Sequence, residues 1–175
     1  MGDSSLSAIV PAYNEEHSLE SSVLKTKQSF KSLDIDYEII IVNDCSSDRT
    51  GDIAEAMAQQ EPEVSCCHHE INQGIGNAFK TGIRDATKDY VVFVPVDSPL
   101  DSDDIKTYLP RIDLCDIIVG VRVERVGYTH IARFLSFFYN RILVPLLFNV
   151  GIQDVNWIQV YRRQLFVDGI INYSS

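Results

Sequence analysis

Residues 38–51 read EIIIVNDCSSDRTG and decide the fold class. Glu38 to Val42 form a nearly continuous apolar run, which is typical of a strand buried on both faces of a parallel sheet. A polar loop follows this run, and Ser47 or Asp48 can cap a helix that begins there. This strand, loop and helix form the repeating unit from which α/β proteins are built.

The same alternation of apolar runs and amphipathic stretches extends along most of the chain. We expect the strands and helices of this pattern, in chain order, at 6–10, 15–33, 38–42, 48–59, 64–67, 76–87, 90–96, from about 101, and at 116–121. This order predicts a single α/β domain over 1–175, with a mostly parallel sheet between helices. Ligands of such sheets gather at the carboxyl ends of the strands, so chemistry is expected in the loops after Val10, Val42 and Val96.

The composition excludes several classes of protein. The chain has 175 residues, of which 45% are hydrophobic, and this composition excludes a disordered protein. A formal net charge of -10 without a basic run argues against general nucleic-acid binding. The four cysteines have no disulfide-framework spacing and the start of the chain has no secretory signal, so we expect a cytoplasmic protein. Residues 66–69, which read CCHH, lack metal-ligand spacing and are interpreted as structural.

Charge is distributed unevenly along the chain. Through Asp116 there are 22 acidic and 9 basic side chains, whereas the remainder has 3 acidic side chains and 6 basic ones, all arginines. The planar fork of arginine suits phosphate or carboxylate, so this pattern indicates an anionic partner. A solvated, mildly basic surface explains the same composition slightly better when composition is considered alone.

Residues 130–152 are rich in Phe, Leu, Ile and Val, but Arg133, Arg141 and Pro145 interrupt them. Because a membrane span needs about 20 predominantly apolar residues, this stretch is too interrupted to cross a bilayer with ease. Two interpretations remain equally open. The stretch is either an amphipathic helix that lies in a membrane interface or an ordinary helix that covers one face of the sheet.

Three loops carry the residues suited to binding. Residues 10–16 read VPAYNEE, in which proline ends the strand and the Tyr13 ring can stack on a planar base. In the next loop Asp44 can accept a hydrogen bond from a base, whereas Ser47 and Asp48 are interpreted as helix caps. Residues 72–82 read NQGIGNAFKTG and fail the dinucleotide fingerprint, because the third glycine comes six residues after Gly76. They predict a turn before a helix whose amino terminus and Lys80 can face an anion; a simple tight turn is the alternative.

Together, these loops resemble those of the family 2 glycosyltransferases, which have the Rossmann-like GT-A fold. Within that family the chain resembles the polyprenyl-phosphate sugar transferases, of which dolichol-phosphate mannose synthase is one kind. The resemblance continues through Gly120-Val121-Arg122, the spacing of Arg133, Ser136 and Asn140, and Asp154 before Tyr161-Arg162-Arg163. Relatives of this kind normally continue beyond the double arginine, so we expect the chain to lack carboxyl-terminal elements.

The resemblance implies a role for each matched residue. The residues that would hold the nucleotide sugar are Pro11, Ala12, Tyr13, Glu15, Asp44, Gly76, Lys80 and Asp97. Asp97 matches the second acid of the family's DxD-type motif, so it would be catalytic and would bind Mg2+ or Mn2+. Arg122, Arg133 and Ser136 would hold the acceptor phosphate, and Asp154 would act near the reaction centre. A cap of the turn before Trp157 explains Asp154 nearly as well.

The sequence departs from the family at the expected metal site. Pro95 stands where the first acid of the motif is usual, and Pro99 replaces a glutamine that often helps to hold the ion. Asp97 is therefore the only matched metal ligand, while Asp101, Asp103 and Asp104 are unaligned candidates.

These features predict an inverting enzyme that moves a sugar from a UDP- or GDP-sugar to a polyprenyl phosphate, dolichyl or undecaprenyl, at the cytoplasmic membrane face. A transferase with a saccharide acceptor, and a non-catalytic domain that binds nucleotide sugars, are the alternatives. A receiver-like phosphoacceptor domain ranks last, because the final strand has no convincing lysine. The sugar, the nucleotide and the oligomeric state are not specified by these patterns.

Overall fold

The computed structural model describes residues 4–120 and 159–169. By its contacts the chain divides into two compact units, one formed by Met1–Ile118 with Val160–Ser175 and the other by Val119–Gln159. Nearly all of the described residues belong to the first unit. The single domain expected over 1–175 stays a prediction. So does the interfacial helix at 130–152, which lies outside the described residues.

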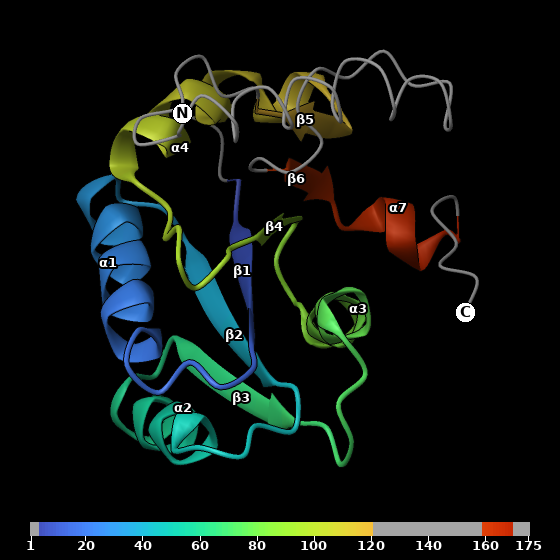
Figure 1. The fold of residues 1–175 in the computed structure, drawn as a ribbon. Coiled ribbons are helices and arrows are strands. Elements are labelled where there is room, and N and C mark those ends of the chain that lie inside the picture. Colours follow the sequence, from blue (N-terminus) through green and yellow to red (C-terminus); the bar gives the residue numbers. More distant parts are fainter. Residues whose placement is uncertain (1–3, 121–158, 170–175) are drawn as a thin grey trace, which may run out of the picture. The chain divides into compact units, whose positions relative to one another are not determined.

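A six-stranded, mostly parallel sheet forms the centre of the first unit (Figure 1). β1 pairs in parallel with both β2 and β4, β2 pairs in parallel with β3, and β6 runs antiparallel to β4. In spatial order the strands are β3 (Val64–His68), β2 (Tyr37–Asn43), β1 (Leu6–Ala12), β4 (Tyr90–Phe93), β6 (Gln159–Arg162) and β5 (Ile117–Val119).

Helices cover both faces of this sheet. In Figure 1, α1 and α2 lie on one side of the strands and α3 lies on the other. The helices are α1 (Leu19–Ser32), α2 (Thr50–Gln60), α3 (Ile75–Asp85), α4 (Ser102–Tyr108), the 3-10 helix η1 (Leu109–Leu114) and the short α7 (Gln164–Val167). The α/β class predicted from the sequence is therefore confirmed.

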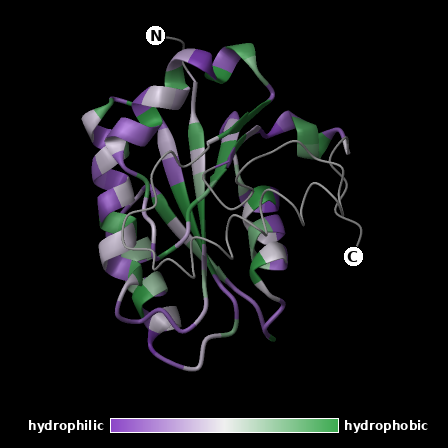
Figure 2. Ribbon diagram, turned by 45° about the horizontal axis from the view of Figure 1, so that its top comes forward, coloured by the Kyte–Doolittle hydropathy of each residue, from purple (hydrophilic) through white to green (hydrophobic). Residues whose placement is uncertain are grey.

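The core lies between the sheet and its helices, where the hydrophobic residues of the strands gather (Figure 2). Ile9 and Val42 of the central strands pack with Ala78 and Ile83 of α3 in one cluster. At Gly82, a Cβ atom would come within 2.2 Å of Ile9 Cγ2. This helix can therefore approach β1 closely only because residue 82 has no side chain.

Element positions agree with the sequence patterns, with three differences. The first helix begins at Leu19 rather than at residue 15, because residues 16–18 form a turn, and the backbone N–H groups of Glu15 and Glu16 before it donate to Thr50 and Asp48. The fourth strand ends at Phe93 rather than at residue 96, before Pro95, which has no N–H for a ladder. The third difference is at the carboxyl-terminal end, where the antiparallel strand β6 and the short α7 were not predicted.

The helices of the described residues can be compared with the length that a membrane span requires. Among residues 4–120 and 159–169, no helix combines the length and the apolar character needed to cross a bilayer.

Candidate functional site

A pocket of about 260 Å³ lies where β1, β2 and β4 end. Its lining residues are Pro11, Ala12, Tyr13, Glu15, Asp44, Ile75, Ala78, Pro95, Val96 and Asp97. The pocket therefore brings together six of the eight residues expected to hold a nucleotide sugar, including both Asp44 and Asp97. Gly76 and Lys80 lie on α3 but are not among the lining residues, whereas their neighbours Ile75 and Ala78 are.

Asp44 is a buried carboxylate held by several donors. Its residue is only 3% exposed, and its backbone N–H donates to Ala12 O at 2.9 Å. Oδ1 accepts from His69 Nδ1 at 2.6 Å and from the Gln73 N–H at 2.9 Å, while Oδ2 accepts from the Gly74 N–H at 2.7 Å. Burial alone would raise the pKa of the Asp44 carboxyl, but these hydrogen bonds outweigh burial and lower the pKa. Asp44 is thus an ionised acceptor at neutral pH.

His69 is a site residue that the sequence patterns did not indicate. It follows β3, its side chain is 7% exposed, and its backbone N–H donates to Asn43 O at 2.9 Å. Because an ionised carboxylate only accepts, Nδ1 carries the proton of the bond to Asp44, and Nε2 lies 2.9 Å from Thr81 Oγ1. The signal that could have found His69 is its position at the carboxyl end of a strand beside β2. The CCHH run itself has no metal-ligand spacing, so its pattern gave no indication of His69 as a site residue.

The loops after β1 and β2 are joined by reciprocal hydrogen bonds. Asn14 Oδ1 accepts from the Ser47 N–H at 2.8 Å, and the Glu15 N–H donates to Thr50 Oγ1 at 2.7 Å. Asn14 and Cys45 have φ angles of 56° and 60°, which non-glycine residues rarely adopt. The two loops therefore hold the pocket lining in a defined conformation.

Asp48 and Ser47, both interpreted as helix caps, behave differently. Asp48 Oδ1 accepts from the N–H of Thr50, the first residue of α2, at 3.0 Å, but Arg49 occupies the N-cap position and makes no side-chain capping bond, so Asp48 is not the N-cap residue. The Ser47 hydroxyl instead lies 3.2 Å from Asn14 Oδ1. Ser47 thus connects the two loops rather than capping the helix.

Asp97 is exposed and follows β4 in a turn, in which the Ser98 N–H donates to Pro95 O at 3.1 Å. Within the described ranges, no group of three or more His, Cys, Asp or Glu side chains is placed to hold a metal ion. Two of the unaligned candidates have local partners, because Asp101 accepts from the Asp103 N–H at 2.9 Å and Asp103 bonds to Lys106 at 3.0 Å. A magnesium-like ion needs only one or two carboxylates when phosphates supply other ligands, so Asp97 alone fits such an ion.

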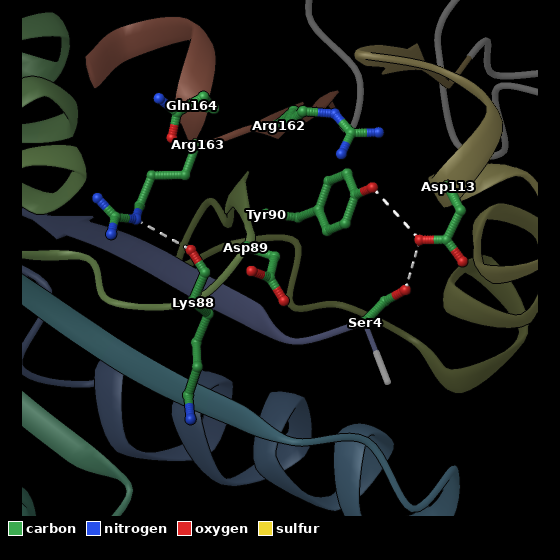
Figure 3. A pocket seen from close by; sticks show the side chains of 8 residues that line it. All are labelled: Ser4, Lys88, Asp89, Tyr90, Asp113, Arg162, Arg163 and Gln164. Atoms are coloured by element: carbon green, nitrogen blue, oxygen red, sulfur yellow. Dashed lines mark hydrogen bonds between the residues drawn. The ribbon is translucent and has the colours of Figure 1, made fainter. Parts of the chain in front are cut away.

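A larger pocket of about 500 Å³ lies beside the residues that begin β1 and β4 (Figure 3). It contains Arg162 and Arg163 of the double-arginine motif, but these side chains have partners. Arg162 Nε donates to Asp116 Oδ1 at 2.9 Å, and Arg163 Nε donates to Lys88 O at 3.1 Å. Since ligands of parallel sheets bind at the carboxyl ends of strands, the smaller pocket at the other edge is the candidate site.

The residues expected on the acceptor side lie outside the described residues. These are Arg122, Arg133, Ser136 and Asp154, and their roles stay predictions.

Comparisons with known proteins agree with this geometry. The sequence model described as "Glycosyl transferase family 2" matches residues 7–168. A dolichyl-phosphate beta-glucosyltransferase from Trichomonas vaginalis is 29% identical over 153 residues, which cover 79% of this chain and 47% of the relative. The chain thus spans about half the length of this curated relative.

Solved structures show the same fold. TarS from S. aureus, residues 1–349 in complex with UDP, is 25% identical with a TM-score of 0.67, covering 97% of this chain and 50% of that one. A mannosyltransferase from Pyrobaculum calidifontis in complex with GDP-Man and Mn2+ is 18% identical with a TM-score of 0.66, covering 93% of this chain and 46% of that one.

Proposed function

The chain belongs to glycosyl transferase family 2, and from this premise we propose that it moves a sugar from a UDP- or GDP-sugar to a polyprenyl phosphate. The GT-A fold expected for this family is confirmed by the sheet and by its similarity to solved structures. The observation that carries the proposal is the presence of Asp44 and Asp97 in one pocket at the carboxyl ends of the strands.

The donor occupies this pocket. Asp44 accepts a hydrogen bond from the base, and Tyr13, which is 49% exposed, stacks on it. Glu15 lies beside them and suits the ribose hydroxyls. Pro11 and Ala12 end β1 beneath the nucleotide. Lys80 and the amino terminus of α3, near Gly76, face the anionic part of the donor.

Asp97 holds a divalent ion, Mg2+ or Mn2+. The fit rests on one exposed carboxylate in the pocket, Asp97, and the donor diphosphate would supply further oxygen ligands. A divalent ion bound there would supply positive charge that offsets the charge of the departing diphosphate.

A lipid phosphate is the acceptor. Its oxygen is already anionic at neutral pH, so the nucleophile needs positioning more than deprotonation, and Arg122, Arg133 and Ser136 supply that. Asp154 contacts the sugar or the acceptor near the reaction centre. The name of the Trichomonas relative and the arginine-rich last third of the chain support this acceptor and, with it, a proposed position at a membrane surface.

Transfer assays on the full chain test this function. Labelled UDP- and GDP-sugars are offered with a polyprenyl phosphate or a saccharide, with Mn2+ or with a chelator. We expect a labelled lipid product that requires the ion, and no product from Asp97→Asn. A saccharide product would contradict the acceptor, and an unchanged rate in the variant would contradict the role of Asp97. Nucleotide binding without transfer to either acceptor would identify a non-catalytic domain.

A further inference from the structure

We propose that Asp44 can accept only one hydrogen bond from a base, that this limit selects a UDP-sugar over a GDP-sugar, and that His69 enforces it. The inference rests on the proposed function, because it concerns which donor the same pocket takes. His69 is assigned here as a positioning residue that acts through Asp44.

The limit follows from the acceptor capacity of the carboxylate. An ionised carboxylate has about four lone-pair sites, two on each oxygen. Both sites of Oδ1 are taken, one by His69 Nδ1 at 2.6 Å and one by the Gln73 N–H at 2.9 Å. Oδ2 accepts from the Gly74 N–H at 2.7 Å. Among the donors that residues 4–120 and 159–169 provide, one site of Oδ2 therefore remains for a ligand.

The two candidate bases differ in the donors that they present. The pairing edge of uracil has a single N–H between two carbonyl oxygens, which matches a single free acceptor site. The pairing edge of guanine has a ring N–H beside an amino group, and a carboxylate binds these adjacent donors through both of its oxygens. Guanine would therefore have to displace a donor from Oδ1 or leave one of its own unpaired in the pocket, and both cost affinity.

The side chain of Asp44 cannot easily turn to offer a second oxygen. The backbone N–H of Asp44 is bonded to Ala12 O, and the carboxylate joins a histidine at the end of β3 to the turn that begins α3. The imidazole of His69 is itself held on its other side by Thr81 of α3, at 2.9 Å. Two of the three donors on Asp44 are backbone groups, so His69 is the side chain through which base preference can be changed.

Calorimetric titration of the full chain with UDP and with GDP tests the inference. Because an unpaired hydrogen-bonding group costs about tenfold or more in affinity, we expect UDP to bind at least about ten times more tightly than GDP. His69→Leu removes the Nδ1 donor and should reduce the ratio of UDP affinity to GDP affinity severalfold. His69→Asn keeps a donor at the position of Nδ1 and should keep the ratio.

His17→Leu serves as the matched control. It makes the same substitution at a histidine whose side chain is 90% exposed and does not line the pocket, so the ratio of UDP affinity to GDP affinity should persist. A ratio that is unchanged in His69→Leu, or that falls equally in His69→Asn, would overturn the role of His69. Tighter or equal binding of GDP by the wild type would overturn the base preference while leaving the proposed function intact. If neither nucleotide binds, both the inference and the proposed function fail.

Discussion

His69 Nδ1 lies 2.6 Å from Asp44 Oδ1, although the two residues are 25 positions apart in the chain. The contact follows from strand register, because β2 and β3 run in parallel with Asn43 paired to His68. The residue after each of these two therefore emerges at the same edge of the sheet. The register of β2 and β3 thus holds the buried carboxylate of Asp44 in the candidate pocket.

Replacement of Asp44 by alanine should weaken nucleotide binding. A hydrogen bond to a charged group contributes about 1.5 to 3 kcal/mol, so we expect a loss of about tenfold to a hundredfold in affinity. Calorimetric titration with UDP and GDP measures it. Asp52→Asn, which removes the charge of an exposed acid on α2 outside the pocket, should bind as the wild type does. Equal affinity in Asp44→Ala would remove Asp44 from the site.

Stability should depend on pH through Asp44. The pKa of the Asp44 carboxyl is lower in the folded protein than in the unfolded chain, where it is about 3.9. Its ionised form therefore contributes fully to the free energy of unfolding above the unfolded pKa, and this contribution is lost as the pH falls through the folded pKa. In urea unfolding, the wild type should exceed Asp44→Asn in free energy of unfolding at pH 7. This difference should narrow below about pH 4. A difference that stays constant down to pH 2 would be inconsistent with an ionised Asp44.

Gly82→Ala should destabilise the fold. The new Cβ would lie 2.2 Å from Ile9 Cγ2, and overpacking of this kind costs about 1 to 3 kcal/mol. Gly76→Ala is the matched control on the same helix, because a Cβ at Gly76 meets nothing within 4 Å. Its free energy of unfolding should stay the same or rise by at most about 1 kcal/mol. Thermal unfolding of the two variants measures the contrast, and an equal effect on both would refute the close packing of α3 on β1.

Arg133→Ala should impair use of the lipid acceptor more than use of the donor. Loss of a charge-assisted hydrogen bond to phosphate should raise the KM for polyprenyl phosphate about tenfold or more, with a smaller change for the nucleotide sugar. Steady-state transfer assays separate the two constants. Arg84→Ala, at an exposed arginine of α3, is the control. An equal rise in the KM for polyprenyl phosphate and the KM for the nucleotide sugar in Arg133→Ala would contradict an acceptor role.

The strands and helices of the first unit were predictable because burial on both faces of a parallel sheet leaves a strong pattern. The run at Glu38 to Val42 became the central part of β2, and Asp44, which follows the end of this strand, lines one pocket with Asp97. The loops after β1 and β2 could be located for the same reason, since each follows an apolar run directly.

Other features depend on contacts that no local pattern records. β6 is short and antiparallel, and it lies between β4 and β5 in the sheet although it comes later in the chain, so only long-range pairing defines it. The chain before α1 is held by hydrogen bonds from the Glu15 and Glu16 N–H groups to Thr50 and Asp48, which are 35 and 32 positions away. His69 became a site residue only through the register of β3 on β2, which its neighbours in the sequence do not reveal.

A crystal structure of the full chain with a UDP-sugar and Mn2+ tests the central claim most directly. The predicted result is a nucleotide in the pocket at the carboxyl ends of the strands, with its base on Asp44 and its diphosphate, through the ion, on Asp97. A nucleotide found instead in the pocket beside Arg162 and Arg163, at the opposite edge of the sheet, would contradict it.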